Sequence, residues 1–264
     1  MRASMGDWYS TAVPGAIVAV SFDAGGTLID VREPVGDTYA RHARALGFPV
    51  TSDAMAAGFA AAFASAPALA APAAASADEV SAFERAWWRA VVARALAHAL
   101  ASNGSTDETE PAFERLFDDL FAHYATASAW LVHPDAEPAL AELRARGVAI
   151  GILSNFDARL HPLMRDLGIA RYVRAVVVSS EARAAKPARA AFDAAARALG
   201  GTPPDRLLHV GDSLHDDVRG AQAAGWNAAW IVRGAGDVAD EAPPRGAARV
   251  GSLLEVARLV SDRA

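Results

Sequence analysis

Three things are scarce in this chain of 264 residues. It contains no cysteine, which excludes disulfide bonds and thiolate-ligated metal sites. It contains one lysine, Lys186, and apart from histidine all its other basic side chains are arginines. No window approaches 18 apolar residues without an interruption by a charge or a proline, so we expect no membrane-spanning helix.

The net charge and the first residues exclude further classes of protein. A formal net charge of −6 at pH 7 argues against a nucleic-acid-binding protein, because such proteins usually carry a basic surface. Residues 1–15 contain no continuous apolar core, so they do not resemble a signal peptide and are treated as an N-terminal tail. We therefore expect a cytoplasmic protein that binds neither nucleic acid nor membranes.

Apolar side chains are abundant, at 53% of the residues, and can form a sizeable core. The length fits one domain with a large insertion, or two domains. Alanine and arginine are also abundant, a composition typical of proteins from GC-rich genomes. Lys186 has been retained against this bias, which makes it a candidate functional residue.

The second half of the chain alternates between two patterns. Short runs rich in Val, Ile and Leu are typical of buried parallel strands, and they occupy 148–155, 173–180, 206–212 and 227–232. Helical patterns lie between them, at 157–167, 187–199 and 215–224, and each is followed by a glycine that can end a helix. This alternation predicts βαβ units, and hence an α/β protein with a parallel sheet.

One further buried-strand pattern, at 16–23, stands far from the others in sequence. Between it and the second half, residues 33–133 are rich in alanine and helical in periodicity, with few β-branched runs. We predict that this segment is a helical insertion after the first strand. The core would then consist of 16–32 and 134–264.

Polar side chains follow the predicted strands at the ends where ligands bind in parallel sheets. Asp23 ends the first strand, Ser154 and Asn155 end the second, Lys186 begins a helix after the third, and Asp212 ends the fourth. Because these strand ends lie at one edge of a parallel sheet, we expect a lone carboxylate, a hydroxyl, a cation and an acidic cluster to meet there.

This set of side chains is suited to phosphoryl transfer. Crowded carboxylates repel one another unless a cation neutralises them, and oxygen ligands without clustered histidine favour Mg²⁺. Ser154 and the backbone N–H groups of the Gly-Gly-Thr turn would hold phosphate oxygens, while Lys186 would neutralise phosphate charge. Asp23 would attack in line and form an aspartyl phosphate.

Four motifs occur in order along the chain: "FDAGGTLID", "ILSNFD", "KP" and "GDSLHDDVRGAQAAG". They resemble those of the haloacid dehalogenase (HAD) superfamily of hydrolases and span about 16–233. The stretch "FDAGGTLIDVREPVGDTYARHARALG" resembles the HAD-like hydrolase domain-containing 3 type. The resemblance implies a Rossmann-like core with the nucleophile on the first strand. It also implies that 33–133 is the helical C1 cap of subfamily I, which closes over the site.

Matched to the family's motifs, Asp23 corresponds to the nucleophile, Ser154 to the phosphate-binding hydroxyl and Lys186 to the lysine of the third motif. The residues expected to hold the phosphate are Gly26, Thr27, Ser154, Asn155 and Lys186. The resemblance thus implies a small phosphorylated compound as the substrate.

The resemblance also implies a Mg²⁺ site. Its ligands would be Asp23, the backbone carbonyl of Gly25, Asp212 and one more acid from the fourth motif. Both Asp216 and Asp217 are available for that last position, and the spacing to "GAQAAG" favours Asp217.

Gly25 departs from the pattern of the phosphatase branches, which have a second aspartate at this position to protonate the leaving oxygen. General acid catalysis typically contributes about 10²–10⁴-fold to a rate. Its loss matters most for alkyl phosphates and little for acyl or aryl phosphates, which leave without a proton. His215 lies among the acids and could replace the missing donor, although a solvated loop histidine is the more ordinary interpretation.

Two other functions stay open at this point. A 2-haloacid dehalogenase uses the same aspartate and needs no metal, but the acid-rich "GDSLHDD" would have no purpose there. A degenerate member could bind a phosphorylated ligand or a protein with little turnover. The weakened Mg²⁺-dependent phosphatase, as a monomer or a homodimer, is the favoured hypothesis.

Overall fold

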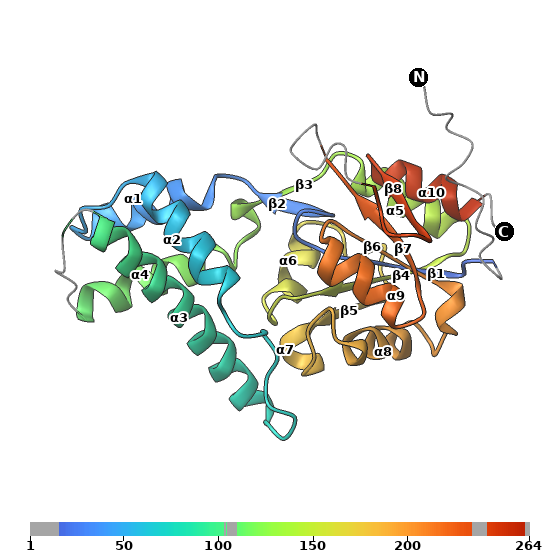
Figure 1. Ribbon diagram of the computed structural model, residues 1–264, viewed down its shortest axis with the longest axis horizontal. Helices are drawn as coiled ribbons and strands as arrows, with labels where there is room; N and C mark the ends of the chain where they lie inside the picture. Colours follow the sequence, from blue (N-terminus) through green and yellow to red (C-terminus); the bar gives the residue numbers. More distant parts are fainter. Residues whose placement is uncertain (1–15, 103, 105–109, 234–241, 262–264) are drawn as a thin grey trace.

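The computed structural model describes residues 16–102, 104, 110–233 and 242–261, and the expected tail at 1–15 lies outside this range. The described residues form two lobes that lie next to each other, one built around a sheet and one built of helices (Figure 1). The chain passes from the first strand into the helical lobe and then returns to complete the sheet.

The sheet has six strands in the order β5-β4-β1-β6-β7-β8, and every neighbouring pair is parallel. The strands are β1 (Ala19–Phe22), β4 (Ala149–Ser154), β5 (Ala175–Val178), β6 (Leu207–Gly211), β7 (Asn227–Ile231) and β8 (Ala247–Val250). The predicted α/β class is confirmed. The first five strands lie within the predicted apolar runs, whereas β8 was not predicted.

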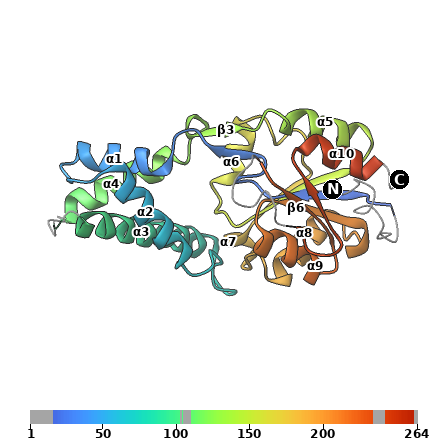
Figure 2. The ribbon, with the colours of Figure 1, turned by 45° about the horizontal axis from the view of Figure 1, so that its top comes forward.

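Helices cover both faces of this sheet (Figure 2). One face packs against α5 (Ala136–Ala145), α6 (Leu160–Asp166) and α10 (Leu253–Ser261). The other face packs against α8 (Arg189–Ala198) and α9 (Gly220–Ala223). The short α7 (Ser179–Ala182) follows β5 directly. Because both faces are covered, β1, β4 and β6 are almost wholly buried, which explains their continuous apolar runs.

The predicted helix at 215–224 differs from the observed one. Its first part, Leu214–Arg219, is a π-helical segment, and only Gly220–Ala223 is α-helical. The side chain of Ser213 caps this segment by accepting a hydrogen bond from the Asp216 N–H. A π-helical turn contains more residues than an α-helical one, and such turns occur frequently at functional sites.

The helical lobe is built from α1 (Val35–Ala45), α2 (Ser52–Ala64), α3 (Ala77–Ser102) and α4 (Glu110–His123). It has an apolar core of its own, in which Tyr39, Met55, Leu96 and Phe117 are buried. Within the residues that the structure describes, no helix has the length and apolar character needed to cross a membrane.

A two-stranded antiparallel ribbon connects the lobes. It consists of β2 (Ile29–Val31) and β3 (Trp130–Val132), and it was not predicted. Arg32 ties the ribbon together, because its guanidinium donates to the carbonyls of Ser128 and Trp130. The ribbon lies where the chain leaves the sheet lobe after β1, so both connections to the helical lobe run beside the carboxyl ends of the strands.

Side chains also join the lobes directly. On α3, the Trp88 indole donates to Asp157 and Glu84 accepts from the hydroxyl of Ser180, both at 2.5 Å. Asp157 lies in the loop after β4, and Ser180 lies in α7. Nearby, Arg183 donates to three carbonyl oxygens of the segment that precedes α3. The helical lobe is therefore held against the sheet lobe by buried polar contacts as well as by the ribbon.

Candidate active site

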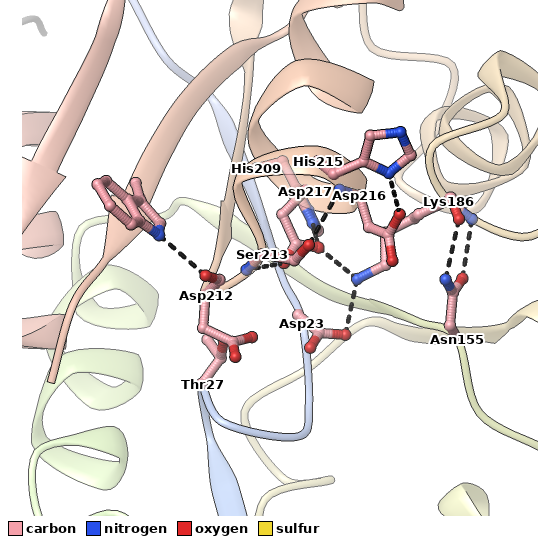
Figure 3. Close-up of polar contacts among 11 residues, drawn as sticks. Asp23, Thr27, Asn155, Lys186, His209, Asp212, Ser213, His215, Asp216 and Asp217 are labelled. Carbon is pink, nitrogen blue, oxygen red and sulfur yellow. Dashed lines mark hydrogen bonds and ion pairs between the residues drawn. The ribbon is translucent and has the colours of Figure 1, made fainter. Parts of the chain in front are cut away.

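Asp23 lies directly after β1, the strand at the centre of the sheet. Its N–H donates to the carbonyl of Val210 on β6 at 2.8 Å, so the sheet hydrogen bonding continues up to this residue. Its residue exposure is 9%, and its carboxylate lies at the carboxyl edge of the sheet (Figure 3). The hydroxyl of Ser154, at the end of neighbouring β4, lies near enough to this carboxylate to lower its pKa.

The only lysine of the chain lies between two carboxylates (Figure 3). The Nζ atom of Lys186 lies 2.7 Å from Asp23 Oδ1 and 2.5 Å from Asp217 Oδ1. Its side chain is 3% exposed. Burial alone would lower the pKa of this ammonium, but the charges of Asp217 and Asp23 together raise it. Lys186 is therefore a permanently charged bridge between these carboxylates.

Asn155 fixes the backbone of Lys186. Its amide oxygen accepts from the Lys186 N–H at 2.8 Å, and its amide nitrogen donates to the Lys186 carbonyl at 2.9 Å. The sequence predicted a phosphate contact for Asn155. That contact stays a prediction, and in the structure both ends of the Asn155 amide bond the main chain of Lys186, which gives it a part in positioning this ammonium.

A third carboxylate, that of Asp212, joins the group at the end of β6. Carboxylate oxygens of Asp23, Asp212 and Asp217 all lie within 4.8 Å of one another. The Thr27 hydroxyl lies 3.5 Å from Asp212 Oδ1, and the Trp230 indole donates to the Asp212 carbonyl at 2.9 Å. Three hard oxygen donors facing one ammonium leave an excess of negative charge, which fits a divalent cation such as Mg²⁺.

The ionisation of these acids reflects their surroundings. Asp212 is exposed as a residue, yet desolvation of its carboxylate and the charges of Asp23 and Asp217 raise its pKa to about 7. Burial also raises the pKa of Asp23, an effect that Lys186 opposes. The pKa of Asp217 is lowered, because Lys186 and a hydrogen bond from His209 outweigh its burial. A cation held by the three groups would relieve the repulsion at Asp212.

The turn after Asp23 approaches Asp212 closely at one glycine. A Cβ atom on Gly26 would lie 2.5 Å from Asp212 Oδ2, and Gly26 has a φ of +70°, so only glycine fits. At Gly25 the situation is different, since a Cβ atom would meet nothing within 4 Å and φ is not positive. Gly25 lies in the same turn, and its carbonyl stays a predicted metal ligand.

The structure separates the two neighbouring acids of the fourth motif. Asp217 is buried with Lys186, and its Oδ2 accepts from the Ser213 N–H at 2.9 Å. Asp216 instead pairs at 2.8 Å with His215, whose side chain is 72% exposed. Of the two candidates for the second acid, Asp217 is the one that joins the cluster (Figure 3).

The sequence interpretation missed His209. Its ring lies within β6, with Nε2 3.0 Å from Asp217 Oδ1, and the side chain is fully buried. Burial lowers the pKa of His209, so the ring is neutral, and the hydrogen bond to a carboxylate requires the proton to be on Nε2. A histidine in the middle of the apolar run "RLLHVG" was the available signal, because a polar side chain inside a buried strand needs a partner.

Known proteins resemble this chain in sequence and in fold. The family model described as haloacid dehalogenase-like hydrolase matches residues 17–225. The chain belongs to this family. It is a hydrolase built on the HAD fold, and the resemblance in its four motifs is confirmed.

The relatives include several kinds of HAD protein. The human haloacid dehalogenase-like hydrolase domain-containing protein 3 is 32% identical over 213 residues, which are 81% of either chain. A phosphoserine phosphatase from Thermus thermophilus is 36% identical over 57% of this chain and 59% of its own. Among solved structures, the L-2-haloacid dehalogenase RSc1362 is 26% identical, with a TM-score of 0.61 over 93% of this chain and 99% of its own.

Proposed function

We propose that this hydrolase is a Mg²⁺-dependent phosphatase that acts on a small phosphorylated compound through an aspartyl phosphate on Asp23. The observation that carries the proposal is the convergence of three carboxylates around Lys186. A dehalogenase, which needs no metal, would gain nothing from the uncompensated charge of Asp212. The phosphatase names among the relatives lend further support.

The role proposed for each residue follows from the chemistry of its side chain. Mg²⁺, held by Asp23, Asp212 and Asp217 with the Gly25 carbonyl, would neutralise charge on the phosphate. Lys186 neutralises further phosphate charge and keeps the carboxylate of Asp23 oriented.

The reaction then runs in two displacements. A carboxylate oxygen of Asp23 attacks phosphorus, and the bond from phosphorus to the bridging oxygen breaks with its electron pair on the leaving group. Water next attacks phosphorus of the aspartyl phosphate, which returns the Asp23 carboxylate and releases inorganic phosphate. The Ser154 hydroxyl and the N–H groups of Gly26 and Thr27 are the proposed donors to the phosphate oxygens.

The helical lobe, residues 33–133, is proposed to act as a cap. It would cover the active site of the core, which is formed by 16–32 and 134–264. Its position beside the carboxyl ends of β1 and β4 and its polar contacts with the loop after β4 support this role. A cap that closes on the substrate would exclude water from the first displacement.

The test is phosphate release from acetyl phosphate and p-nitrophenyl phosphate, with Mg²⁺ and with a chelator. We expect turnover only with Mg²⁺ and its loss in the Asp23→Asn and Asp212→Asn variants. Asp216→Asn is the matched control, because this neighbouring acid pairs with His215 outside the cluster. Turnover that is equal in chelator, or that survives Asp23→Asn, would refute the proposal.

Dehalogenation is the second candidate, supported by Gly25 and by the similarity to the dehalogenase RSc1362. Halide release from 2-chloropropionate that does not need Mg²⁺ would identify it. Stabilisation of the fold by phosphate and Mg²⁺ without turnover of any of these compounds would instead indicate a binding protein.

A further inference from the structure

An apolar cavity of about 80 Å³ lies where the helical lobe meets the sheet lobe. Twelve of the thirteen residues that line it are apolar or aromatic. They come from the helices of the helical lobe, from both strands of the ribbon and from the loop after β4; among them are Tyr39, Phe59, Trp88, Val92, Phe121 and Phe156. The cavity therefore spans the junction between the lobes.

The one charged residue in the lining, Arg159, is already paired. Its Nε and Nη2 donate to the two carboxylate oxygens of Asp157 at 2.9 and 2.6 Å, and its Nη1 donates to the Phe121 carbonyl at 3.1 Å. Its guanidinium also lies 3.9 Å from the centre of the Phe121 ring. Asp157 is fully buried and neutralises the charge of Arg159. The cavity therefore offers a ligand no free charge from this arginine.

One short loop connects this cavity with the active site. Ser154 ends the strand β4 that pairs with β1 beside Asp23, and it is two residues from Phe156, which lines the cavity. Consecutive Cα atoms are 3.8 Å apart, so these two residues are separated by at most about 7 Å. Between them, Asn155 holds the backbone of Lys186. A phosphate at Asp23 would thus have its organic group within reach of the cavity.

We propose that the cavity receives the organic group of the substrate, and that this group is short, apolar and uncharged. A charged group would lose its hydration here without finding an opposite charge that is free to pair with it. The lining does contain a buried hydroxyl without a hydrogen-bond partner, that of Tyr124, but the rest of the lining that faces a ligand is overwhelmingly apolar. A cavity of about 150 Å³ accommodates benzene, so about 80 Å³ leaves room for roughly three carbon atoms. The inference rests on the proposed function, since it names the substrate class of the same site.

A series of acyl phosphates tests this inference without involving a general acid. Acetyl, propionyl, butyryl and hexanoyl phosphate all release a carboxylate that needs no proton, so they differ mainly in chain length. Burial of each CH₂ group predicts a rise in kcat/KM of about fourfold from acetyl to propionyl and again to butyryl. Hexanoyl phosphate exceeds the cavity, so we expect no further rise. Methoxyacetyl phosphate is as long as butyryl and a better leaving group, yet we expect it to react more slowly.

Two neighbouring valines on α3 provide a matched pair of variants. Val92 lines the cavity, whereas Val91 is equally buried and does not. Threonine keeps the shape of valine and adds a hydroxyl. We expect Val92→Thr to lower the ratio of kcat/KM for butyryl to that for acetyl phosphate at least threefold, and Val91→Thr to leave this ratio unchanged.

The possible outcomes separate this inference from the proposed function. Mg²⁺-dependent hydrolysis with equal kcat/KM across the series would overturn the inference and keep the function. A kcat/KM for methoxyacetyl phosphate equal to that for butyryl phosphate would also overturn the inference and keep the function. The absence of hydrolysis of every member would overturn both. The series uses the unmodified protein, so it remains decisive even if a threonine variant fails to fold.

Discussion

Replacing Gly25 with aspartate should restore a proton donor that the proposed phosphatase lacks. The position accepts a side chain, because a Cβ atom there meets nothing within 4 Å and the backbone is not in the left-handed region. The new carboxyl group would be two residues from Asp23, which places their Cα atoms at most about 7 Å apart. It would therefore join the acidic edge without displacing its members.

The neighbouring charge sets the magnitude. Two carboxylates about 7 Å apart repel by roughly 2.4 kcal/mol at an effective dielectric constant of 20. This repulsion by Asp23 would raise the pKa of an aspartate at position 25 above its ordinary value. Such a group is protonated in a useful fraction of molecules near neutral pH, as a general acid must be.

The assay compares two phosphates of equal size. Ethyl phosphate releases an alcohol and needs a proton, whereas acetyl phosphate releases a carboxylate and does not. We expect Gly25→Asp to raise kcat for ethyl phosphate by about 10²-fold, within the 10²–10⁴-fold that general acids supply, and to change kcat for acetyl phosphate less than tenfold. Gly25→Asn is the control, since it has the same shape and no acidic proton.

Two results would contradict this reasoning. The first is a folded Gly25→Asp protein with no gain on ethyl phosphate. The second is an equal gain in Gly25→Asn, which would mean that the side chain acts by shape. If the unmodified protein already hydrolyses ethyl phosphate as fast as acetyl phosphate, another donor is present, and His215 would be the first to replace.

Three further perturbations test the structure itself. Lys186→Met leaves two buried carboxylates without their cation and should lower the free energy of unfolding by about 3–5 kcal/mol, measured by urea titration without metal. A loss below about 1 kcal/mol would contradict the role of Lys186 as an ionic bridge between Asp23 and Asp217. Asp212 has a folded pKa of about 7, above its unfolded value, so the unmodified metal-free protein should lose stability as pH rises from about 4 to 7. Because Asp212 is exposed and solvent screens its charge, we expect a loss of only about 1–2 kcal/mol, and none of it in Asp212→Asn. Trp88→Phe removes the hydrogen bond to Asp157 and should lower the free energy of unfolding by about 1–3 kcal/mol. The control is Trp87→Phe, which removes a hydrogen bond to an exposed carbonyl and should lower the free energy of unfolding by less than about 1 kcal/mol. Equal losses in the two variants would contradict the anchoring of the helical lobe by Trp88.

Much of the sheet could be predicted because parallel strands covered on both faces leave a strong apolar signal. The strand β8 lacked this signal, since only the last of its four residues is buried. The ribbon strands β2 and β3 have three residues each and one buried residue each, which is too short for a period to be recognised. Such short strands form because they pair with neighbouring strands, and the sequence alone does not show which segments pair.

The candidate site could be predicted as a set of residues but not as a set of contacts. Strand ends brought Asp23, Asp212 and Lys186 to one edge, as parallel topology requires. The spacing to "GAQAAG" favoured Asp217 over Asp216, and Asp217 is the acid that joins the cluster, but the π-helical turn that carries it has no simple sequence pattern. The partner of the Asn155 amide depended on how the loop before α8 returns to the sheet, and that is a tertiary contact.

The single lysine has a practical consequence for measuring local opening. Lys186 is the only side-chain amine of the chain, and in the folded protein it is buried, ion-paired and held protonated. Amine-acylating reagents attack only an unprotonated and accessible amine, so modification at this position requires the site to open. The modified fraction of the peptide that contains Lys186, followed by mass spectrometry over time, would report how often the acidic cluster comes apart. Because each molecule has only one side-chain amine, the measured rate reports the opening of the site around Lys186.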